Sequence, residues 1–213
     1  MLKRSTLPNA ITVARIAVTP VIVLLLFTPT FTARLAAFIL FLVAAFSDLW
    51  DGYLARKHGW ISDFGKLWDP IADKLLLGAT FIPFYILSLR PVPETQIPVF
   101  GTLPLWVLLV VLGREALVTL IRSLVAHRGI VIPAGKAGKM KALFQNIFIG
   151  TTIFWFALRT AGASHGWEGD AWRNWQIFHA SVLLVTLAIA VLLTVYSMLV
   201  YLWEWRRIVR MVA

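Results

Sequence analysis

The chain has 213 residues, of which 60% are hydrophobic and only 14% are charged, and its mean hydropathy is +0.81. This composition lacks the polar surface of a soluble globule, so it indicates an integral membrane protein. The net charge of +10 does not indicate a nucleic-acid partner, because the Lys and Arg residues are scattered among apolar runs and form no single basic face.

Six apolar segments follow one another, each near the ~20 residues that a bilayer core requires. Their connections are short, so we predict one all-α domain over residues 1–213, a bundle of six transmembrane helices. The first segment loosely resembles a signal peptide, but Arg15 interrupts its apolar run, and we expect a retained span. The predicted spans are Asn9–Phe27, Arg34–Arg56, Gly65–Leu89, Pro104–His127, Lys141–Ala161 and Trp175–Trp205.

The distribution of Lys and Arg predicts the orientation of this bundle. The side that holds both termini would carry twelve of these residues near the span ends, against four on the other side, which are Arg34, Arg90, Arg159 and Arg173. Because cytoplasmic loops are enriched in Lys and Arg, we expect both termini in the cytoplasm. The expected location is the cytoplasmic membrane of a bacterium.

The first span opens with "LPNAITVARI", which places Asn9, Thr12 and Arg15 at intervals of three residues. Taken alone, this trio is compatible with a capped helix start whose arginine reaches the membrane interface.

Acidic residues gather where the second span ends and the third begins. Asp48 and Asp51 share one helical face, as do Asp69 and Asp73 after the loop. Because the loop is short, we expect the two helices to pack side by side and the four carboxylates to converge at one depth, near the cytoplasmic boundary. The small residues Gly52, Ala55 and Gly65 lie at matching helical spacing.

Four carboxylates at a membrane boundary repel one another and require protonation, pairing or a cation. Two Mg²⁺ or Mn²⁺ ions would balance four negative charges, because hard divalent cations prefer oxygen ligands, and would form a two-metal site for phosphoryl transfer. An interfacial ion-pair cluster that only anchors the helix ends is the alternative.

The fourth span contains "GREALVTLIRSL", in which Arg114, Glu115 and Arg122 interrupt an apolar run. Arg114 and Glu115 are compatible with a structural ion pair, whereas Arg122 has no acid near it in sequence and favours an anionic ligand. Before the fifth span, Lys136, Lys139 and Lys141 form either a cytoplasmic basic flank or a site for a phosphorylated substrate.

The last segment is longer than a span requires, and "YLWEWRR" is expected to carry it past the interface. Its Trp203 and Trp205 are typical of an aromatic belt. The four histidines lack metal-ligand spacing and are expected to be ordinary interfacial residues.

The acidic segment matches the pattern DxxDGxxARx8GxxxDxxxD over residues 48–73 without a substitution. It resembles the signature of the CDP-alcohol phosphatidyltransferases. The resemblance implies an enzyme that transfers a phosphatidyl group from CDP-diacylglycerol to an alcohol and releases CMP. It also implies a homodimer. By this resemblance, Asp48, Asp51 and Asp69 ligate the metal ions, and Asp73 contacts the metal site and acts as the general base.

The resemblance further assigns residues to the donor substrate. Gly52, Ala55 and Gly65 would make room for the nucleotide, and Arg56 would support the carboxylates or the pyrophosphate. The first-span trio is similar to the PNxxTxxR segment of the family branch whose acceptor is sn-glycerol 3-phosphate. There, Asn9, Thr12 and Arg15 would hold the nucleotide or the phosphates of CDP-diacylglycerol.

The "RE" and "GKxK" patterns resemble the same branch. They imply that the acceptor phosphate is bound by Arg114, Arg122, Lys136, Lys139 and Lys141. The chain departs from that branch at Ala142, where a Thr is common, and in having "FSD" before the signature. Inositol phosphate, phosphatidylglycerol or serine is therefore an alternative acceptor. A divalent-cation transporter is the alternative from another class, although the acids gather at one end and no paired halves are visible.

Overall fold

The computed structural model describes residues 6–58, 63–126 and 136–212. Within these ranges, the side chains of residues 6–8, 49, 51–58, 63–67, 125, 126, 136 and 207–212 are not described.

The described residues form six α-helices and one short 3₁₀ helix, with no strand. Each predicted apolar segment coincides with one helix, so the all-α prediction is confirmed, while the helices extend up to a few residues further at most ends. The elements are α1 (Thr6–Phe27), α2 (Phe31–His58), α3 (Asp63–Ser88), η1 (Pro93–Thr95), α4 (Leu105–Ala126), α5 (Lys136–His165) and α6 (Asp170–Val212).

Five of these helices are long and apolar enough to cross a membrane, judged by length and composition. Among the described residues, α4 does not qualify, and it is the helix that carries Arg114, Glu115 and Arg122 within its apolar run. The chain is thus a multi-pass membrane protein. The five stretches are Asn9–Phe27, Phe31–Asp48, Trp68–Ser88, Ala137–His165 and Asp170–Arg206.

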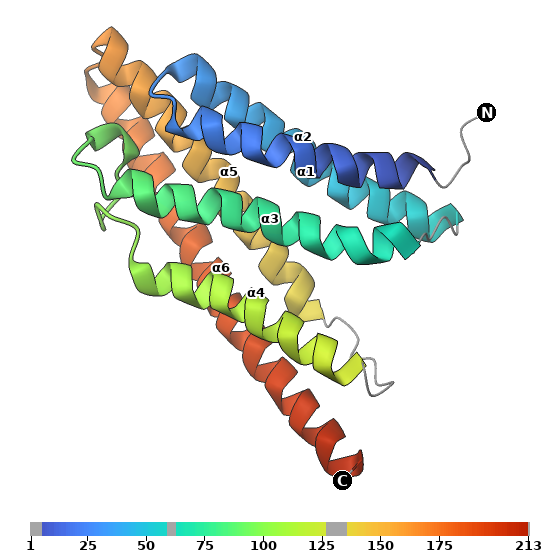
Figure 1. Ribbon diagram of the computed structural model, residues 1–213. Coiled ribbons are helices and arrows are strands. Elements are labelled where there is room, and N and C mark those ends of the chain that lie inside the picture. Colours follow the sequence, from blue (N-terminus) through green and yellow to red (C-terminus); the bar gives the residue numbers. More distant parts are fainter. Residues whose placement is uncertain (1–5, 59–62, 127–135, 213) are drawn as a thin grey trace.

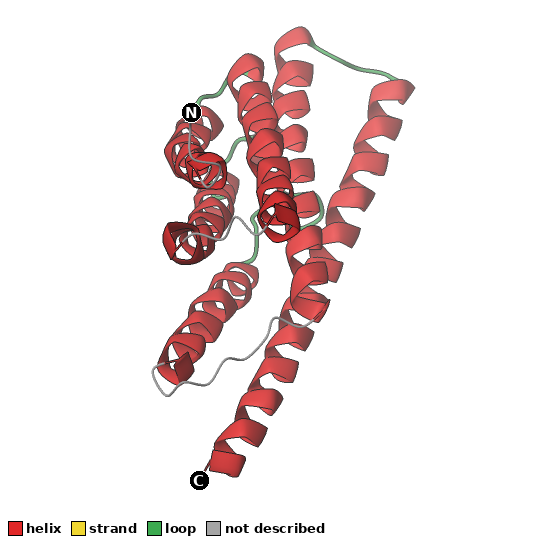
Figure 2. Ribbon diagram, turned by 90° about the vertical axis from the view of Figure 1, so that its right-hand side faces the viewer, coloured by secondary structure: helices red, strands yellow, loops and turns green. Residues whose placement is uncertain are grey.

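The helices run up and down through the molecule, and their ends gather at two opposite sides (Figure 1). The N-terminal ends of α1, α3 and α5 and the C-terminal ends of α2, α4 and α6 lie toward one side, which we call the site end. Residues 28–30, 89–104 and 166–169 connect the helices at the other side, which we call the far end. Figure 2 shows α6 as the longest element, extending beyond its neighbours.

Helix α1 packs against both α2 and α3, α2 packs against α5, and α5 packs against α6. Helix α4 contacts α3 and α6. Extended packing between α2 and α3 is not found among the described residues, but the side chains beside their connecting loop are not described, so the expected packing there stays a prediction. The short turn at residues 28–30 folds α1 back along α2, and α1 packs against both α2 and α3.

A phenylalanine cluster fixes the rotation of α3 against α2 and α5. The ring centroids of Phe81 and Phe148 are 5.4 Å apart, and those of Phe84 and Phe156 are 5.7 Å apart in an edge-on arrangement. Together with Phe41 of α2, these side chains are almost completely buried. Because large rings interdigitate in few ways, this cluster sets which faces of α3 and α5 point toward the site end.

Candidate active site

A cavity of about 730 Å³ opens between α1, α2, α3, α4 and α5 at the site end. Its lining is divided by charge, with carboxylates on α2 and α3 and most of its cations on α4 and α5. The charged lining residues are Arg15, Asp48, Asp69, Asp73, Lys74, Arg114, Glu115, Arg122 and Lys141. Three predicted metal ligands and three predicted acceptor-binding cations therefore share one cavity.

One arginine joins the carboxylates of the second and third helices. Arg15 Nη1 lies 2.5 Å from Asp48 Oδ1 and 2.9 Å from Asp73 Oδ1. The side chain of Arg15 is buried, whereas those of Asp48 and Asp73 are 36% and 54% exposed. Because α1 packs against both α2 and α3, its arginine can bridge two acids that are 25 residues apart. The predicted convergence of these carboxylates is achieved through α1.

Thr12 holds the third carboxylate of the cavity. Its hydroxyl donates a hydrogen bond to Asp69 Oδ1 at 2.5 Å, and Thr12 is buried. Thr12 and Arg15 lie one turn apart on α1, so one face of this helix contacts all three described acids. Asn9 lies one further turn toward the site end and is half-buried. Thr12 and Arg15 thus organise the acids, and the role of the whole first-span trio in holding the donor substrate stays a prediction.

The chemistry of the acidic wall suits a hard divalent cation. Asp48, Asp69 and Asp73 offer carboxylate oxygens to one cavity, and Mg²⁺ and Mn²⁺ prefer such ligands. Among the side chains that the structure describes, no three His, Cys, Asp or Glu residues stand as a ready ligand group. In this arrangement Arg15 pairs with both Asp48 and Asp73, and metal ions bound at the same place would take over these contacts.

The opposite wall is organised by a single acid. Glu115 Oε1 accepts a hydrogen bond from Arg114 Nη1 at 3.0 Å and a second one from Lys141 Nζ. The structural pair of Arg114 with Glu115, considered from the sequence, is confirmed. The pair with Lys141 ties α4 to α5 across 26 residues of chain. All three side chains are mostly buried, so this wall holds its cations in fixed positions.

Arg122 and Lys139 line a smaller cavity, which we call the branch, that adjoins the main one. The branch has a volume of about 290 Å³ and is also lined by Tyr201 and Glu204 of α6. The guanidinium of Arg122 lies 6.0 Å from the ring centroid of Tyr201. Arg122 also lines the main cavity, whereas Lys139 lines only the branch. Arg122, like Arg114 and Lys141, therefore lies where the two spaces meet, and its expected contact with an anionic ligand stays a prediction.

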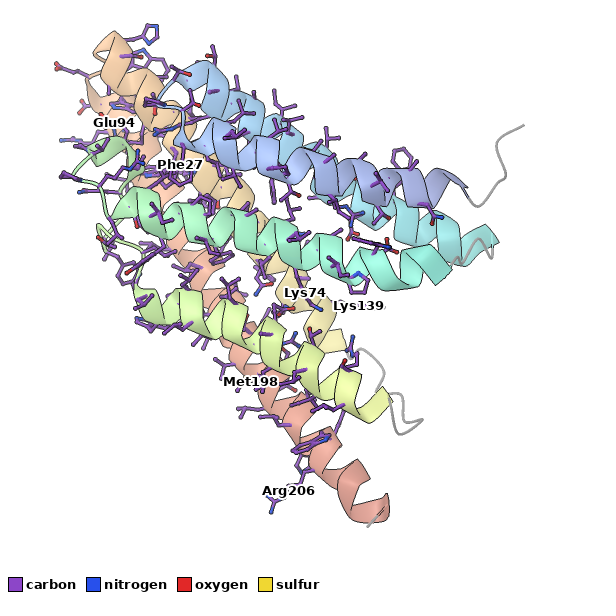
Figure 3. All side chains as sticks on the ribbon, viewed as in Figure 1. Phe27, Lys74, Glu94, Lys139, Met198 and Arg206 are labelled. Atoms are coloured by element: carbon purple, nitrogen blue, oxygen red, sulfur yellow. The ribbon has the colours of Figure 1, made fainter. Side chains whose placement is uncertain are left out.

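The structure adds residues that sequence reasoning missed. Lys74 follows Asp73 on α3 and lines the cavity, and Figure 3 shows it between α3 and α4. Its adjacency to the acidic pattern was a usable signal. Glu115 was considered only as a partner of Arg114, and its pair with Lys141 had no local signal, because the two residues lie on different helices. Gln145 and Asn146 of α5 also line the cavity.

Six predicted site residues have no described side chain. They lie within α2, α3 and α5, at or near the helix ends of the site end, and their roles stay predictions. They are Asp51, Gly52, Ala55 and Arg56 of α2, Gly65 of α3 and Lys136 of α5.

Comparison with known proteins matches the chain to a family model over nearly its whole length. Residues 5–212 match the model of the CDP-alcohol phosphatidyltransferases. A CDP-diacylglycerol–glycerol-3-phosphate 3-phosphatidyltransferase of Bacillus subtilis is 35% identical over 204 residues, covering 82% of this chain and 98% of the relative. The same named enzyme of Rickettsia typhi is 38% identical over 147 residues, covering 69% of this chain and 75% of the relative.

A probable phosphatidylglycerophosphate synthase of Mycobacterium tuberculosis is 37% identical over 164 residues, covering 76% of this chain and 70% of the relative. These similarities extend well beyond the acidic signature, and they agree with a cavity whose walls carry four carboxylates and five cations. The chain belongs to the CDP-alcohol phosphatidyltransferase family and is an enzyme.

Proposed function

We propose that this enzyme transfers a phosphatidyl group from CDP-diacylglycerol to sn-glycerol 3-phosphate, giving phosphatidylglycerophosphate and CMP. The observation that carries this proposal is the division of the cavity, with Asp48, Asp69 and Asp73 opposite Arg114 and the other fixed cations. Support also comes from relatives in Bacillus subtilis and Rickettsia typhi that are named for this reaction. A phosphate-bearing acceptor is favoured over serine because the basic wall offers several cations to one anion.

We propose that two Mg²⁺ or Mn²⁺ ions are held by Asp48, Asp51, Asp69 and Asp73. When bound, such ions supply Lewis-acid stabilisation to the pyrophosphate of the donor and to the leaving CMP. Arg15 keeps the carboxylates of Asp48 and Asp73 together through an ion pair with each. Thr12 orients Asp69 from the same helix face. The acidic wall is thus prearranged by α1.

The acceptor is oriented by the opposite wall. Its phosphate would be bound by Arg122 and by the cations that Glu115 positions, with Lys139 in the adjoining cavity. One of its two free hydroxyls, the one that reacts, then points across the cavity toward α3. Binding both substrates in one enclosed space converts a bimolecular encounter into a reaction between aligned groups.

Asp73 is the proposed general base. As the acceptor oxygen forms its bond to the phosphatidyl phosphorus, the carboxylate of Asp73 takes the hydroxyl proton. The bond between that phosphorus and the oxygen of CMP breaks at the same time, and CMP leaves with the electron pair. Asp73 lines the cavity next to Lys74, a position from which both substrates are accessible.

We propose that α4 is a sixth span and that both termini face the cytoplasm. The charges of α4 would not meet lipid, because Arg114, Glu115 and Arg122 all line the cavity. The site end carries most of the Lys and Arg residues near helix ends, in agreement with a cytoplasmic site end. A single domain over residues 1–213, a bacterial cytoplasmic membrane and a homodimer remain predictions.

An acceptor panel tests the proposed function. The purified chain is incubated with CDP-diacylglycerol, Mg²⁺ or Mn²⁺, and one of sn-glycerol 3-phosphate, inositol phosphate, phosphatidylglycerol or serine, while CMP and the lipid product are measured. We expect CMP release with sn-glycerol 3-phosphate and phosphatidylglycerophosphate as the product. Release only with another alcohol overturns the acceptor, and no release with any of them overturns the proposed reaction.

A further inference from the structure

A third pocket of about 370 Å³, shallow and largely open at the surface, lies at the far end between η1 and the segment after it, helix α5 and helix α6. We call it the far-end cavity, and its lining includes Gln96, Val99, Trp155, Arg159, Gln176 and Ile177. Arg159 follows Lys141 by 18 residues on α5, which is about 27 Å along the helix axis. The far-end cavity is therefore distinct from the candidate active site, and it lies on the side that Glu94 marks in Figure 3.

The far-end cavity contains a cation, Arg159, that forms no ion pair with any described residue. Arg159 Nη2 donates one hydrogen bond, to the backbone oxygen of Pro93 at 3.3 Å, and within the described residues its buried Nε has no hydrogen-bond partner. No carboxylate is among the described residues that line this cavity. The side-chain amides of Gln96 and Gln176 add neutral donors. This donor set suits a singly charged phosphodiester.

Aromatic side chains place this cavity at the depth of lipid headgroups. The rings of Trp155 and Trp175 stack 5.7 Å apart, and those of Trp172 and Trp175 stack 4.7 Å apart. Tryptophan is enriched where membrane meets water. On α6, Trp175 and Trp203 are 28 residues apart, which is about 42 Å of helix and close to the full thickness of a bilayer. The two groups of tryptophans thus mark the two interfaces.

An exposed apolar turn forms one rim of the far-end cavity. Ile97 and Gly101 exchange two backbone hydrogen bonds of 2.7 and 2.9 Å, and the turn between them presents Val99, which is 86% exposed. Val99 has a φ of 69°, which is strained for a β-branched residue. Ile177 is 59% exposed on α6 and also lines the cavity. An apolar rim beside a cation matches the two chemical halves of a phospholipid.

We propose that the far-end cavity binds an anionic phospholipid from the leaflet that faces the far end. Arg159 pairs with the phosphate, while Gln96 and Gln176 donate hydrogen bonds to its oxygens. The first part of an acyl chain lies along Val99 and Ile177. The cation–π contact of Arg159 with Trp155, at 5.5 Å, holds the guanidinium toward the ligand. This proposal stands independently of the reaction at the site end.

Native mass spectrometry of the full chain tests the proposal. Protein in detergent is titrated with phosphatidylglycerol or phosphatidylcholine, and the dissociation constant of the retained lipid is measured. We expect phosphatidylglycerol to be retained more tightly than phosphatidylcholine. Arg159→Gln should raise the dissociation constant of phosphatidylglycerol about tenfold or more, because the variant loses one charge-assisted hydrogen-bonding partner. Millimolar inorganic phosphate should not displace the lipid, because the acyl contacts add affinity. CMP release should stay unchanged.

Arg173→Gln is the matched control, because Arg173 is 73% exposed at the same end and lies outside the cavity. Equal weakening by both variants, or no weakening by Arg159→Gln, overturns the proposal. Displacement of the lipid by inorganic phosphate overturns the assignment of a lipid. If Arg159→Gln does not fold, Gln176→Ala tests the same cavity. We expect this variant to bind the lipid more weakly, by a smaller factor than Arg159→Gln. Unchanged affinity for the lipid would count against the proposal.

Discussion

In each of the two walls of the active-site cavity, one residue of opposite charge holds two residues of like charge together. On the acidic wall, the buried Arg15 bridges Asp48 and Asp73. On the basic wall, the mostly buried Glu115 bridges Arg114 and Lys141. Each wall therefore has one opposite charge that keeps like charges together before a ligand arrives.

The walls differ in exposure, and the difference indicates their roles. Asp48 and Asp73 are about one-third and one-half exposed, whereas Arg114 and Lys141 are mostly buried. Exposed carboxylates can exchange Arg15 for metal ions at little cost in desolvation. Buried cations gain more from a fixed partner, because their charge is costly in a medium of low dielectric constant. We therefore infer that the acidic wall is remodelled on loading and that the basic wall is preformed.

Asp73→Asn is expected to have the largest effect. If Asp73 is both a metal ligand and the general base, kcat should fall by roughly 10²–10⁴-fold, the usual contribution of a general base. CMP release under saturating substrates measures this. Asp170→Asn, an exposed acid at the far end, is the matched control and should keep full activity. Full turnover in the Asp73 variant would contradict the assignment of the base.

Arg122→Gln tests whether the basic wall binds the acceptor phosphate. Loss of one charged hydrogen-bond donor to the acceptor phosphate is expected to raise KM for sn-glycerol 3-phosphate by roughly 10–100-fold. KM for CDP-diacylglycerol should change little, because Arg122 lies on the wall opposite the carboxylates. Steady-state kinetics with each substrate varied in turn separate the two effects. An equal rise in both KM values would show that Arg122 does not belong to the acceptor subsite.

Arg15→Gln tests whether the acidic wall depends on its arginine. Removing a buried cation leaves two neighbouring carboxylates unbalanced, and since both are partly exposed we expect a loss of about 1–3 kcal/mol in unfolding free energy. Thermal unfolding in detergent measures this loss, and Mg²⁺ should restore part of it by neutralising the same acids. A variant as stable as the parent chain, with or without Mg²⁺, would show that Arg15 does not organise this wall.

Glu115→Gln is expected to have the smallest kinetic effect. The variant loses the group that positions Arg114 and Lys141 but gains net positive charge, and these changes oppose each other in acceptor binding. We expect KM for sn-glycerol 3-phosphate to change by less than about tenfold, with a steeper dependence on salt. Kinetics at several NaCl concentrations measure both quantities. An unchanged salt dependence would argue against Glu115 as the counter-charge of this wall.

The sequence by itself determined the secondary structure and the chemical character of the site. Six apolar runs of sufficient length predict six helices, because backbone groups in lipid must satisfy their hydrogen bonds within one segment. The i, i+3 and i, i+4 spacings of Asp48, Asp51, Asp69 and Asp73 predict shared helix faces, because the helical period is local. These properties depend on neighbours in the chain, so they can be read without knowing the packing.

Only the tertiary structure decided which helices meet and which charges pair. The sequence does not indicate that α1 packs against both α2 and α3 and so brings Arg15 to Asp48 and Asp73. The contacts of Thr12 with Asp69 and of Glu115 with Lys141 join residues 57 and 26 positions apart. Such pairs depend on how each helix is rotated about its axis. That rotation is set by the packing of large side chains in the core, a property of the whole bundle and of no single segment.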